Sequence, residues 1–280
     1  MKRINKYFAS IKDVEWLSIK IPLAYVWLIV LRDSLKGLGV IIEPKGICNI
    51  LDCSMATGNL GYWAILLISF VLGVFYLFEI RMKWTTLGMC FISILVFSAE
   101  ESTGILKRNG TLSFLFFAQS TAYWVYYSRF KKLALNRIQF SVQAITVGYF
   151  LSACSKLLDA GLSWPFDGQR ISLQVLKSFH YSYYTELDVS QLAKANDFVL
   201  FLSDSKGLLL TALITTLIME FFSLTAVLNK TYARVYGIAL LLMHLGIYYF
   251  MDVLITSFAI PMVIVLINPI FLGLLLFKRE

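Results

Sequence analysis

Apolar stretches of roughly 20 residues, the length that carries an α-helix across a bilayer, recur along almost the whole chain. A helix also satisfies its own backbone hydrogen bonds inside the hydrocarbon, where water is absent. Hydrophobic residues make up 59% of the 280 residues, which exceeds the usual share of about one half in a soluble domain. The sequence therefore predicts an all-α, polytopic membrane helical bundle.

We expect eight transmembrane spans in a single membrane domain, residues 1–280. No secretory cleavage site follows the first apolar stretch, so we interpret that stretch as a retained span and not as a signal peptide. The chain shows neither an internal repeat nor a low-complexity tract, so a second domain is not expected. The predicted spans are 19–40, 59–80, 84–99, 111–128, 138–158, 207–228, 235–252 and 256–276.

The net charge of +8 comes from lysines and arginines that flank the spans. In an eight-span arrangement every basic cluster falls on one side, as the positive-inside rule predicts, so both termini are expected in the cytoplasm. The excess of positive charge therefore indicates the orientation of the chain in the membrane, and nucleic acid is not expected as a partner. The residues that define this side are Lys2, Arg3, Lys6, Lys12, Arg81, Lys83, Arg129, Lys131, Lys132, Arg137, Lys230, Arg234, Lys278 and Arg279.

The outer side then holds the segments 41–58, 100–110 and 159–206. Only the last of these is long enough to form a small cap. Apolar residues recur at roughly helical spacing from Leu187 to Leu200, which predicts one or two amphipathic helices on the outer membrane interface.

Two of the four cysteines, Cys48 and Cys53, fall in the first outer segment, whereas Cys90 and Cys154 fall inside spans. A cysteine within a span usually behaves as a small hydrophobic residue. An oxidising compartment favours a disulfide across so short a loop, so we expect Cys48 and Cys53 to form a structural bridge. A redox-active pair is the alternative, although the spacing is not that of the C-x-x-C motif. No further cluster of histidine or cysteine completes a zinc site.

Lys156 ends an apolar run near the outer end of the fifth span, shortly before Trp164. One interpretation is that its stem is buried while its ammonium group reaches the membrane interface. The alternative is that Lys156 faces the bundle, because lysine is disfavoured on the non-cytoplasmic side and the preceding small residues allow close helix packing. An inward ammonium group would serve as a base or as an anion partner.

Four other ionisable residues within predicted spans are candidates for a functional site, because a charge inside a membrane segment is costly. His244 is flanked by apolar residues, so it is either a core residue bonded to a neighbouring helix or a group for proton transfer. Glu220 needs a cationic partner such as Lys156, Arg32 or His244. Arg32 and Asp33 are adjacent in the first span, and we interpret them as contributors to a structural ion pair.

The order of these residues resembles the membrane domain of the vitamin K-dependent gamma-glutamyl carboxylases and their bacterial relatives, the HTTM proteins. The resemblance lies between residues 140 and 268 and ends in the segment "ITSFAIPMVIVL". The residues that carry it are Tyr149, Ala153, Ser155, Lys156, Leu157, Trp164, Asp167, Gly168, Glu220, Arg234 and His244.

In that family the matching lysine acts with a reduced quinone and oxygen, so the resemblance implies catalytic roles for Lys156 and His244. It also implies an integral protein of the bacterial inner membrane. Two departures argue against full glutamate carboxylation. Asn109 is followed by Gly110 where the carboxylases have a histidine, and the large extracytoplasmic region of the carboxylases is absent.

The chain is also similar to the small membrane protein of the bacterial pair that matures a sporulation-delaying toxin. This similarity implies maturation of an exported peptide at the outer face, together with a separate protein partner. Two alternatives stay open. One is a quinone-linked thiol oxidoreductase that uses Cys48 and Cys53, and the other is a non-catalytic membrane module that binds a toxin or a lipid.

Overall fold

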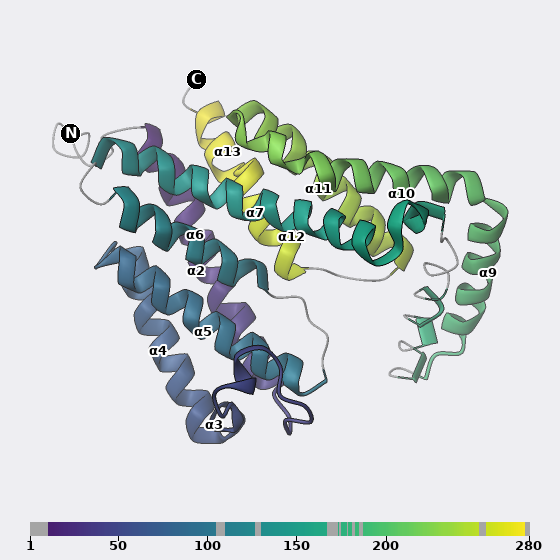
Figure 1. Ribbon diagram of the computed structural model, residues 1–280, viewed down its shortest axis with the longest axis horizontal. Helices are drawn as coiled ribbons and strands as arrows, with labels where there is room; N and C mark the ends of the chain where they lie inside the picture. Colours follow the sequence, from purple (N-terminus) through teal and green to yellow (C-terminus); the bar gives the residue numbers. More distant parts are fainter. Residues whose placement is uncertain are drawn as a thin grey trace. The chain divides into compact units, whose positions relative to one another are not determined.

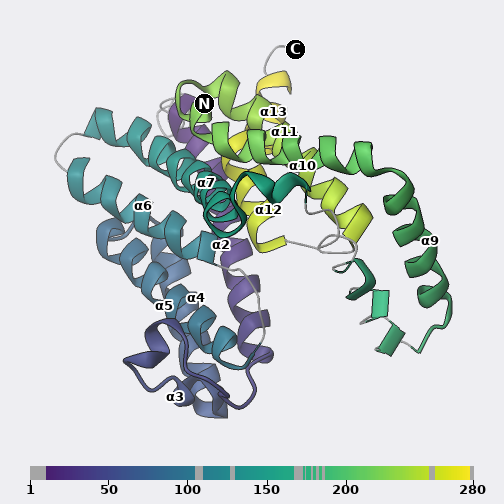
Figure 2. The same cartoon turned by 45° about the vertical axis from the view of Figure 1, so that its right-hand side comes forward.

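The computed structural model describes residues 11–104, 110–126, 130–166, 187–251 and 256–277, and a few positions between 173 and 184. Every regular element within these ranges is helical, which confirms the all-α prediction (Figures 1 and 2). The chain forms two compact units, a first unit of Met1–Ile145 with Ser257–Glu280 and a second unit of Thr146–Thr256. The single membrane domain stays a prediction.

Within the described residues, five helical segments are long and apolar enough to cross a membrane. They coincide with predicted spans one, two, three, six and eight. Helices α6 (Gly110–Tyr126), α7 (Phe130–Ala160) and α11 (Lys230–Met251) occupy the ranges of the other three, whose crossing stays a prediction, as does the orientation of the termini. The five segments are Asp13–Lys36, Asn59–Leu77, Met82–Ser102, Lys206–Val227 and Phe258–Phe277.

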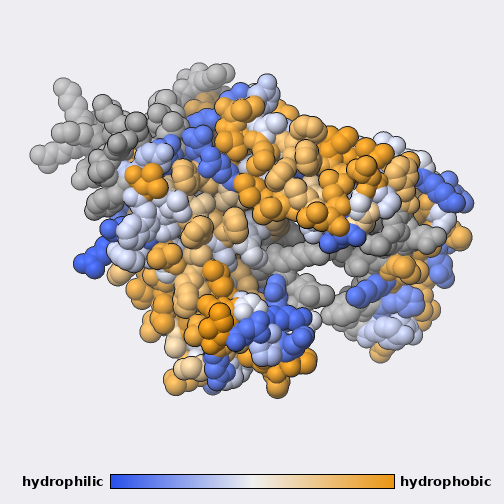
Figure 3. Space-filling model, in the orientation of Figure 1, coloured by the Kyte–Doolittle hydropathy of each residue, from blue (hydrophilic) through white to orange (hydrophobic). Residues whose placement is uncertain are grey.

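Helix α4 (Asn59–Leu77) is apolar on its exposed side and carries small or polar residues on its packed side. Ser69, Gly73 and Tyr76 are buried, whereas Trp63, Leu67 and Phe70 are exposed along with other large apolar residues. This distribution is the reverse of that in a soluble helix and suits contact with lipid. Hydrophobic side chains also cover α4 and α5 in Figure 3.

Helices α5 (Met82–Ser102) and α6 lie side by side through polar and small side chains of the first unit (Figure 1). Helix α2 (Ile11–Lys36) packs on α4 and α5, where Trp27 donates a 2.8 Å hydrogen bond to Ser93. The indole ring of Trp27 also contacts Phe116 edge to face. Interhelical hydrogen bonds of this kind hold helices together in lipid, where the hydrophobic effect between helices is absent.

The segment after α2 folds onto the end of α5. The backbone amides of Lys45 and Ile47 donate hydrogen bonds to the hydroxyl groups of Ser102 and Ser98, respectively. Gly46 adopts a φ of +57°, and a Cβ there would lie 2.5 Å from Ser98 Oγ, so only glycine fits. The short helices η1 (Gly46–Asn49) and α3 (Ser54–Thr57) flank the disulfide between Cys48 and Cys53, which confirms that pairing.

The last predicted span is two helical pieces in the first unit. Helix α12 (Thr256–Met262) continues as a π-helical turn, η4 (Val263–Ile267), and α13 (Pro269–Phe277) follows. Asn268 separates the two pieces with a φ of +51°, and its buried side chain accepts a hydrogen bond from the amide of Phe271 in the first turn of α13. A residue before proline disfavours the α-helical region, which places the break there.

The second unit contains the second half of α7, then η2 (Gly161–Phe166), α9 (Ser190–Asp204), α10 (Lys206–Phe221), η3 (Phe222–Val227) and α11. Helix α10 packs on η2, η3 and α11. Helix α9 turns away from α10 at Ser205 in both views (Figures 1 and 2). A helix therefore occupies the predicted amphipathic segment, and its place on a membrane interface stays a prediction.

Candidate functional site

One face of α7 in the second unit carries Thr146, Tyr149, Ala153 and Lys156. Their spacing of three, four and three residues places them in one line along the helix, over about 15 Å at 1.5 Å per residue. We name this line the α7 seam. The backbone or side chain of Thr146, Tyr149 and Lys156 is bonded to a polar side chain from a later element of the same unit.

Lys156 forms an ion pair with Glu220 of α10. The carboxylate is almost fully buried, at 6% exposed, whereas the lysine side chain retains 24%. The indole of Trp164, from η2, lies 4.9 Å from Lys156 Nζ and covers it through a cation–π contact. The ammonium group therefore points inward to Glu220, as the second of the two interpretations of Lys156 expected.

Tyr149 and His244 form the second contact of the seam, across a distance of 2.6 Å between the phenol oxygen and Nε2. His244 lies near the middle of α11, and its hydrogen bond to a neighbouring helix agrees with one of its two interpretations. In the tautomer with the proton on Nδ1, the phenol donates to Nε2.

Ser223 binds the seam at Thr146, its first residue in the chain. Its hydroxyl donates a 2.8 Å hydrogen bond to the backbone carbonyl of Thr146, and both residues are fully buried. Ser223 follows Glu220 by three residues across the junction of α10 and η3, so one short stretch supplies two partners to α7. The seam thus fixes α7 to the α10–η3 segment at two points.

The chemistry available to the seam is proton exchange. A lysine and a carboxylate in hydrogen-bond contact exist either as an ion pair or, after one proton moves, as a neutral amine and a neutral acid. Burial penalises the charged pair, which brings these two forms closer in free energy than they are in water. Lys156 is therefore placed to act as a base when Glu220 takes its proton.

Arg32 and Asp33 pair with each other. The guanidinium group contacts the Asp33 carboxylate at 2.8 and 3.0 Å, and both side chains are about half exposed. Side chains one apart on a helix do not face the same neighbour, so this pair joins no second helix. The interpretation of Arg32 and Asp33 as members of a structural ion pair agrees with this contact.

The described residues contain no group of three or more histidine, cysteine or acidic side chains that would hold a metal ion. Cys90 and Cys154 are free thiols, and Cys90 is buried in α5. Asp167 and Gly168, which belong to the family resemblance, lie outside the described residues, as does Asn109.

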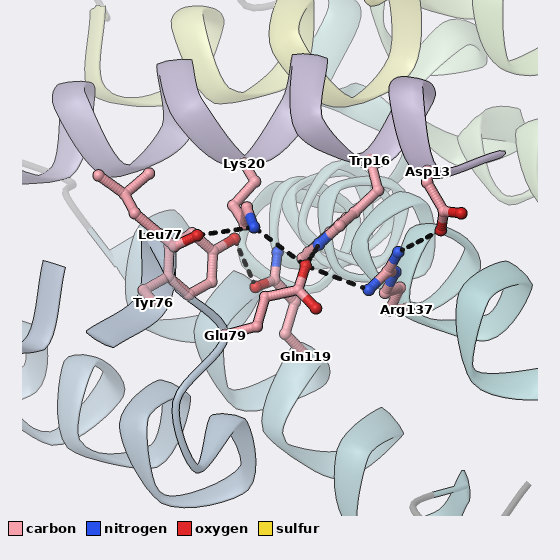
Figure 4. Close-up of polar contacts among 8 residues, drawn as sticks. All are labelled: Asp13, Trp16, Lys20, Tyr76, Leu77, Glu79, Gln119 and Arg137. Atoms are coloured by element: carbon pink, nitrogen blue, oxygen red, sulfur yellow. Dashed lines mark hydrogen bonds and ion pairs between the residues drawn. The ribbon is translucent and has the colours of Figure 1, made fainter. Parts of the chain in front are cut away.

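A second buried polar site, in the first unit, was not anticipated from the sequence. It joins α2, the α4–α5 turn and the first half of α7 (Figure 4). We name it the α2 charge cluster. Its members are Asp13, Trp16, Lys20, Glu79 and Arg137.

Lys20 is the centre of this cluster. Its ammonium group, 3% exposed, donates 2.9 Å hydrogen bonds to the Glu79 carboxylate and to the carbonyl of Leu77, the last residue of α4 (Figure 4). A cation at this position satisfies a carbonyl that has no partner within its own helix. The indole of Trp16 also donates to Glu79, at 3.0 Å.

Arg137 contacts Glu79 and Asp13 at 3.5 and 3.4 Å and lies 4.7 Å from the centre of the Trp16 ring. Burial raises the pKa of Glu79, but the hydrogen bonds and charges of Lys20 and Arg137 outweigh it, and the pKa is held below its ordinary value. Lys20 inside the first predicted span was the available sequence signal, since a charge there needs a partner.

The chain matches no protein-family model, no curated protein and no solved structure.

Proposed function

We propose that this protein is a membrane-embedded enzyme, or an enzyme subunit, that modifies or matures an exported peptide at the outer membrane face. Lys156 is the acid–base group, Glu220 exchanges protons with it, and His244 is the second reactive group. The observation that supports this proposal is the Lys156–Glu220 pair itself, a buried carboxylate bonded to a partly exposed ammonium group. Ionisable residues inside membrane segments are costly and mark functional sites.

The proposed step moves one proton at a time. Glu220 accepts a proton from the Lys156 ammonium group, which leaves a neutral amine and a neutral carboxylic acid. The amine then takes a proton from the peptide and becomes the ammonium group again. Glu220 gives its proton to water or to the modified peptide, which restores the ion pair. Trp164 shields the ammonium group from water, which strengthens its interaction with Glu220.

A reduced quinone is the cofactor that the family resemblance implies. The residues of the seam suit a quinone head group, because Tyr149 and Lys156 offer hydrogen-bond donors and Trp164 offers an aromatic face. When bound, a reduced quinone would supply electrons to the reaction. Lys156 would then donate a hydrogen bond to the head group, and Tyr149 would do so in the tautomer in which His244 Nε2–H donates to the phenol oxygen.

The decisive experiment replaces the pair by apolar residues of similar size, Lys156→Met with Glu220→Leu. Such a swap of a buried ion pair usually keeps or raises stability. The expected result is normal abundance of the membrane protein together with loss of peptide modification, which mass spectrometry of the secreted peptides would detect. Lys156→Arg serves as the charge-preserving variant, and Arg32→Ala tests an ion pair outside the seam.

Two outcomes would overturn the proposal. Unchanged peptide products in the double variant would assign the pair to folding alone and favour a non-catalytic module that binds a toxin or a lipid. Parallel loss of abundance and products in every variant would do the same. Retention of activity in Lys156→Arg would instead show that a positive charge suffices and that no proton leaves Lys156.

The oxidoreductase alternative rests on Cys48 and Cys53. Both residues are buried, with 8% and 3% of their surface exposed, and thiol–disulfide exchange requires access of a thiolate to the sulfur atoms. Their burial supports a structural bridge. Trapping both thiols during turnover would test this, since a pair that cycles between oxidised and reduced forms would contradict it.

A further inference from the structure

A tryptophan pair with a lysine beside it lies where α5 begins and α6 ends in the first unit. The rings of Trp84 and Trp124 meet edge to face with their centres 5.0 Å apart. Lys83 Nζ lies 4.7 Å from the centre of Trp124 and 5.7 Å from that of Trp84. The hydroxyl of Ser120 donates a 3.0 Å hydrogen bond to the carbonyl of Lys83, which ties the two helix ends together.

These aromatic rings are only half covered by the protein. Trp84 is 53% exposed and Trp124 is 50% exposed. Such exposure to water is unfavourable, because the indole ring has one of the largest apolar surfaces of any side chain. Two other tryptophans of the first unit, Trp16 and Trp27, are fully buried, whereas Trp63 on α4 is exposed. An exposed tryptophan pair therefore requires an environment that is apolar on one side and polar on the other.

The same two helix faces continue as exposed phenylalanines. Phe91 follows Trp84 by seven residues on α5, and Phe117 precedes Trp124 by seven residues on α6, so each pair shares one face of its helix. Seven residues correspond to about 10 Å along the helix axis. Toward the start of α5 and the end of α6, the surface thus changes from phenylalanine to tryptophan and lysine. Membrane proteins show the same change between hydrocarbon and head groups.

We infer that Lys83, Trp84 and Trp124 form a contact site for phospholipid head groups. The two indoles lie at the level of the lipid ester and phosphate groups, and the Lys83 ammonium group pairs with a lipid phosphate. The partner is the bilayer itself, because the surface is continuous with the lipid-facing phenylalanines and its charge is opposite to that of phosphate. A basic side chain at this level also favours anionic over neutral lipids.

Depth-dependent fluorescence quenching tests the position of the indoles. The full chain in phosphatidylcholine nanodiscs would be compared with the Trp84→Phe, Trp124→Phe double variant, and the difference gives the signal of this pair. We expect a quencher near the lipid head group to be at least about twofold more effective on that signal than one near the acyl-chain end. Equal or stronger quenching by the deep probe would overturn the inference.

Lipid selectivity tests the lysine. Association of spin-labelled phosphatidylglycerol, relative to phosphatidylcholine, would be measured for the full chain and for Lys83→Ala. We expect the preference to fall about fivefold in Lys83→Ala and to persist in Lys83→Arg. Lys45→Ala, in a loop lysine paired with Glu43, is the matched control and should leave the preference unchanged. An unchanged preference in Lys83→Ala would refute the phosphate contact.

Discussion

The α2 charge cluster of the first unit and the α7 seam of the second unit both neutralise a lysine inside a predicted span, but with different arrangements of partners. Each joins a lysine to a carboxylate from another segment. In the cluster the lysine is the more buried partner and the carboxylate, in a turn, is 41% exposed. In the seam the carboxylate is buried and the lysine retains more exposure.

The number of partners also differs. Glu79 accepts hydrogen bonds from Lys20 and Trp16 and contacts Arg137, and Lys20 in addition binds the end of α4. Among the described residues of the second unit, Glu220 pairs with one cationic side chain, that of Lys156. A carboxylate shared by several donors, paired with a lysine that also binds the end of a helix, fits a structural role. A single pair can exchange a proton without releasing such contacts.

The largest effect is expected from breaking the seam on one side only. Glu220→Leu leaves the partly buried Lys156 without its counter-charge and should lower the free energy of unfolding by about 3 kcal/mol. Adding Lys156→Met should restore most of that loss, because no charge is then left unpaired. Unfolding in detergent, followed by circular dichroism, measures both. A double variant as unstable as the single one would show that the pair stabilises this unit.

The α2 charge cluster should respond in the opposite way. Glu79→Gln is expected to cost about 2 kcal/mol, less than a fully buried pair because Glu79 is partly exposed. Adding Lys20→Met should not restore stability, because Arg137 still lacks a counter-charge and the Leu77 carbonyl loses its donor. The same unfolding measurement applies, with Asp33→Ala as the exposed-pair control. If adding Lys20→Met restored the stability lost in Glu79→Gln, the cluster and the seam would not differ in this respect.

A smaller effect is expected at the Tyr149–His244 contact. Tyr149→Phe keeps the ring and removes one hydrogen bond, which should lower stability by about 1 kcal/mol. Nitrogen chemical shifts of labelled His244 should change in the same variant, since the phenol contacts Nε2. Phe150→Leu, on a neighbouring position of α7, serves as the control for altered packing. Unchanged histidine shifts in Tyr149→Phe would contradict the contact.

The smallest effect concerns acid. The pKa of Glu79 is held below its ordinary value of 4.5, so its contribution to stability is present above that pH and is lost as the pH falls through the folded-state pKa. The wild-type chain should therefore lose stability below about pH 4.5, and the Glu79→Gln variant should lose less over the same range. Parallel acid dependence in the two proteins would exclude Glu79 as the titrating group.

The sequence predicted the ionisable groups of the seam but not all of their pairings. Lys156, Glu220 and His244 are rare types inside apolar segments, so composition alone marked them. Tyr149 entered only through the family resemblance, because a tyrosine in an apolar helix carries no comparable signal. The α2 charge cluster was missed because Arg137 was assigned to topology and Glu79 lies at the very end of the second predicted span, where a charge can reach water and carries no comparable signal.

The sequence by itself determined that this chain is helical and apolar enough to enter a membrane, because those properties depend on local periodicity and on the cost of exposing backbone groups to lipid. It also placed Cys48 and Cys53 close enough to pair. Only the tertiary structure decided that Lys156 meets Glu220 and that Lys20, Glu79 and Arg137 come together. Such contacts join residues far apart in the chain, and helix packing selects them.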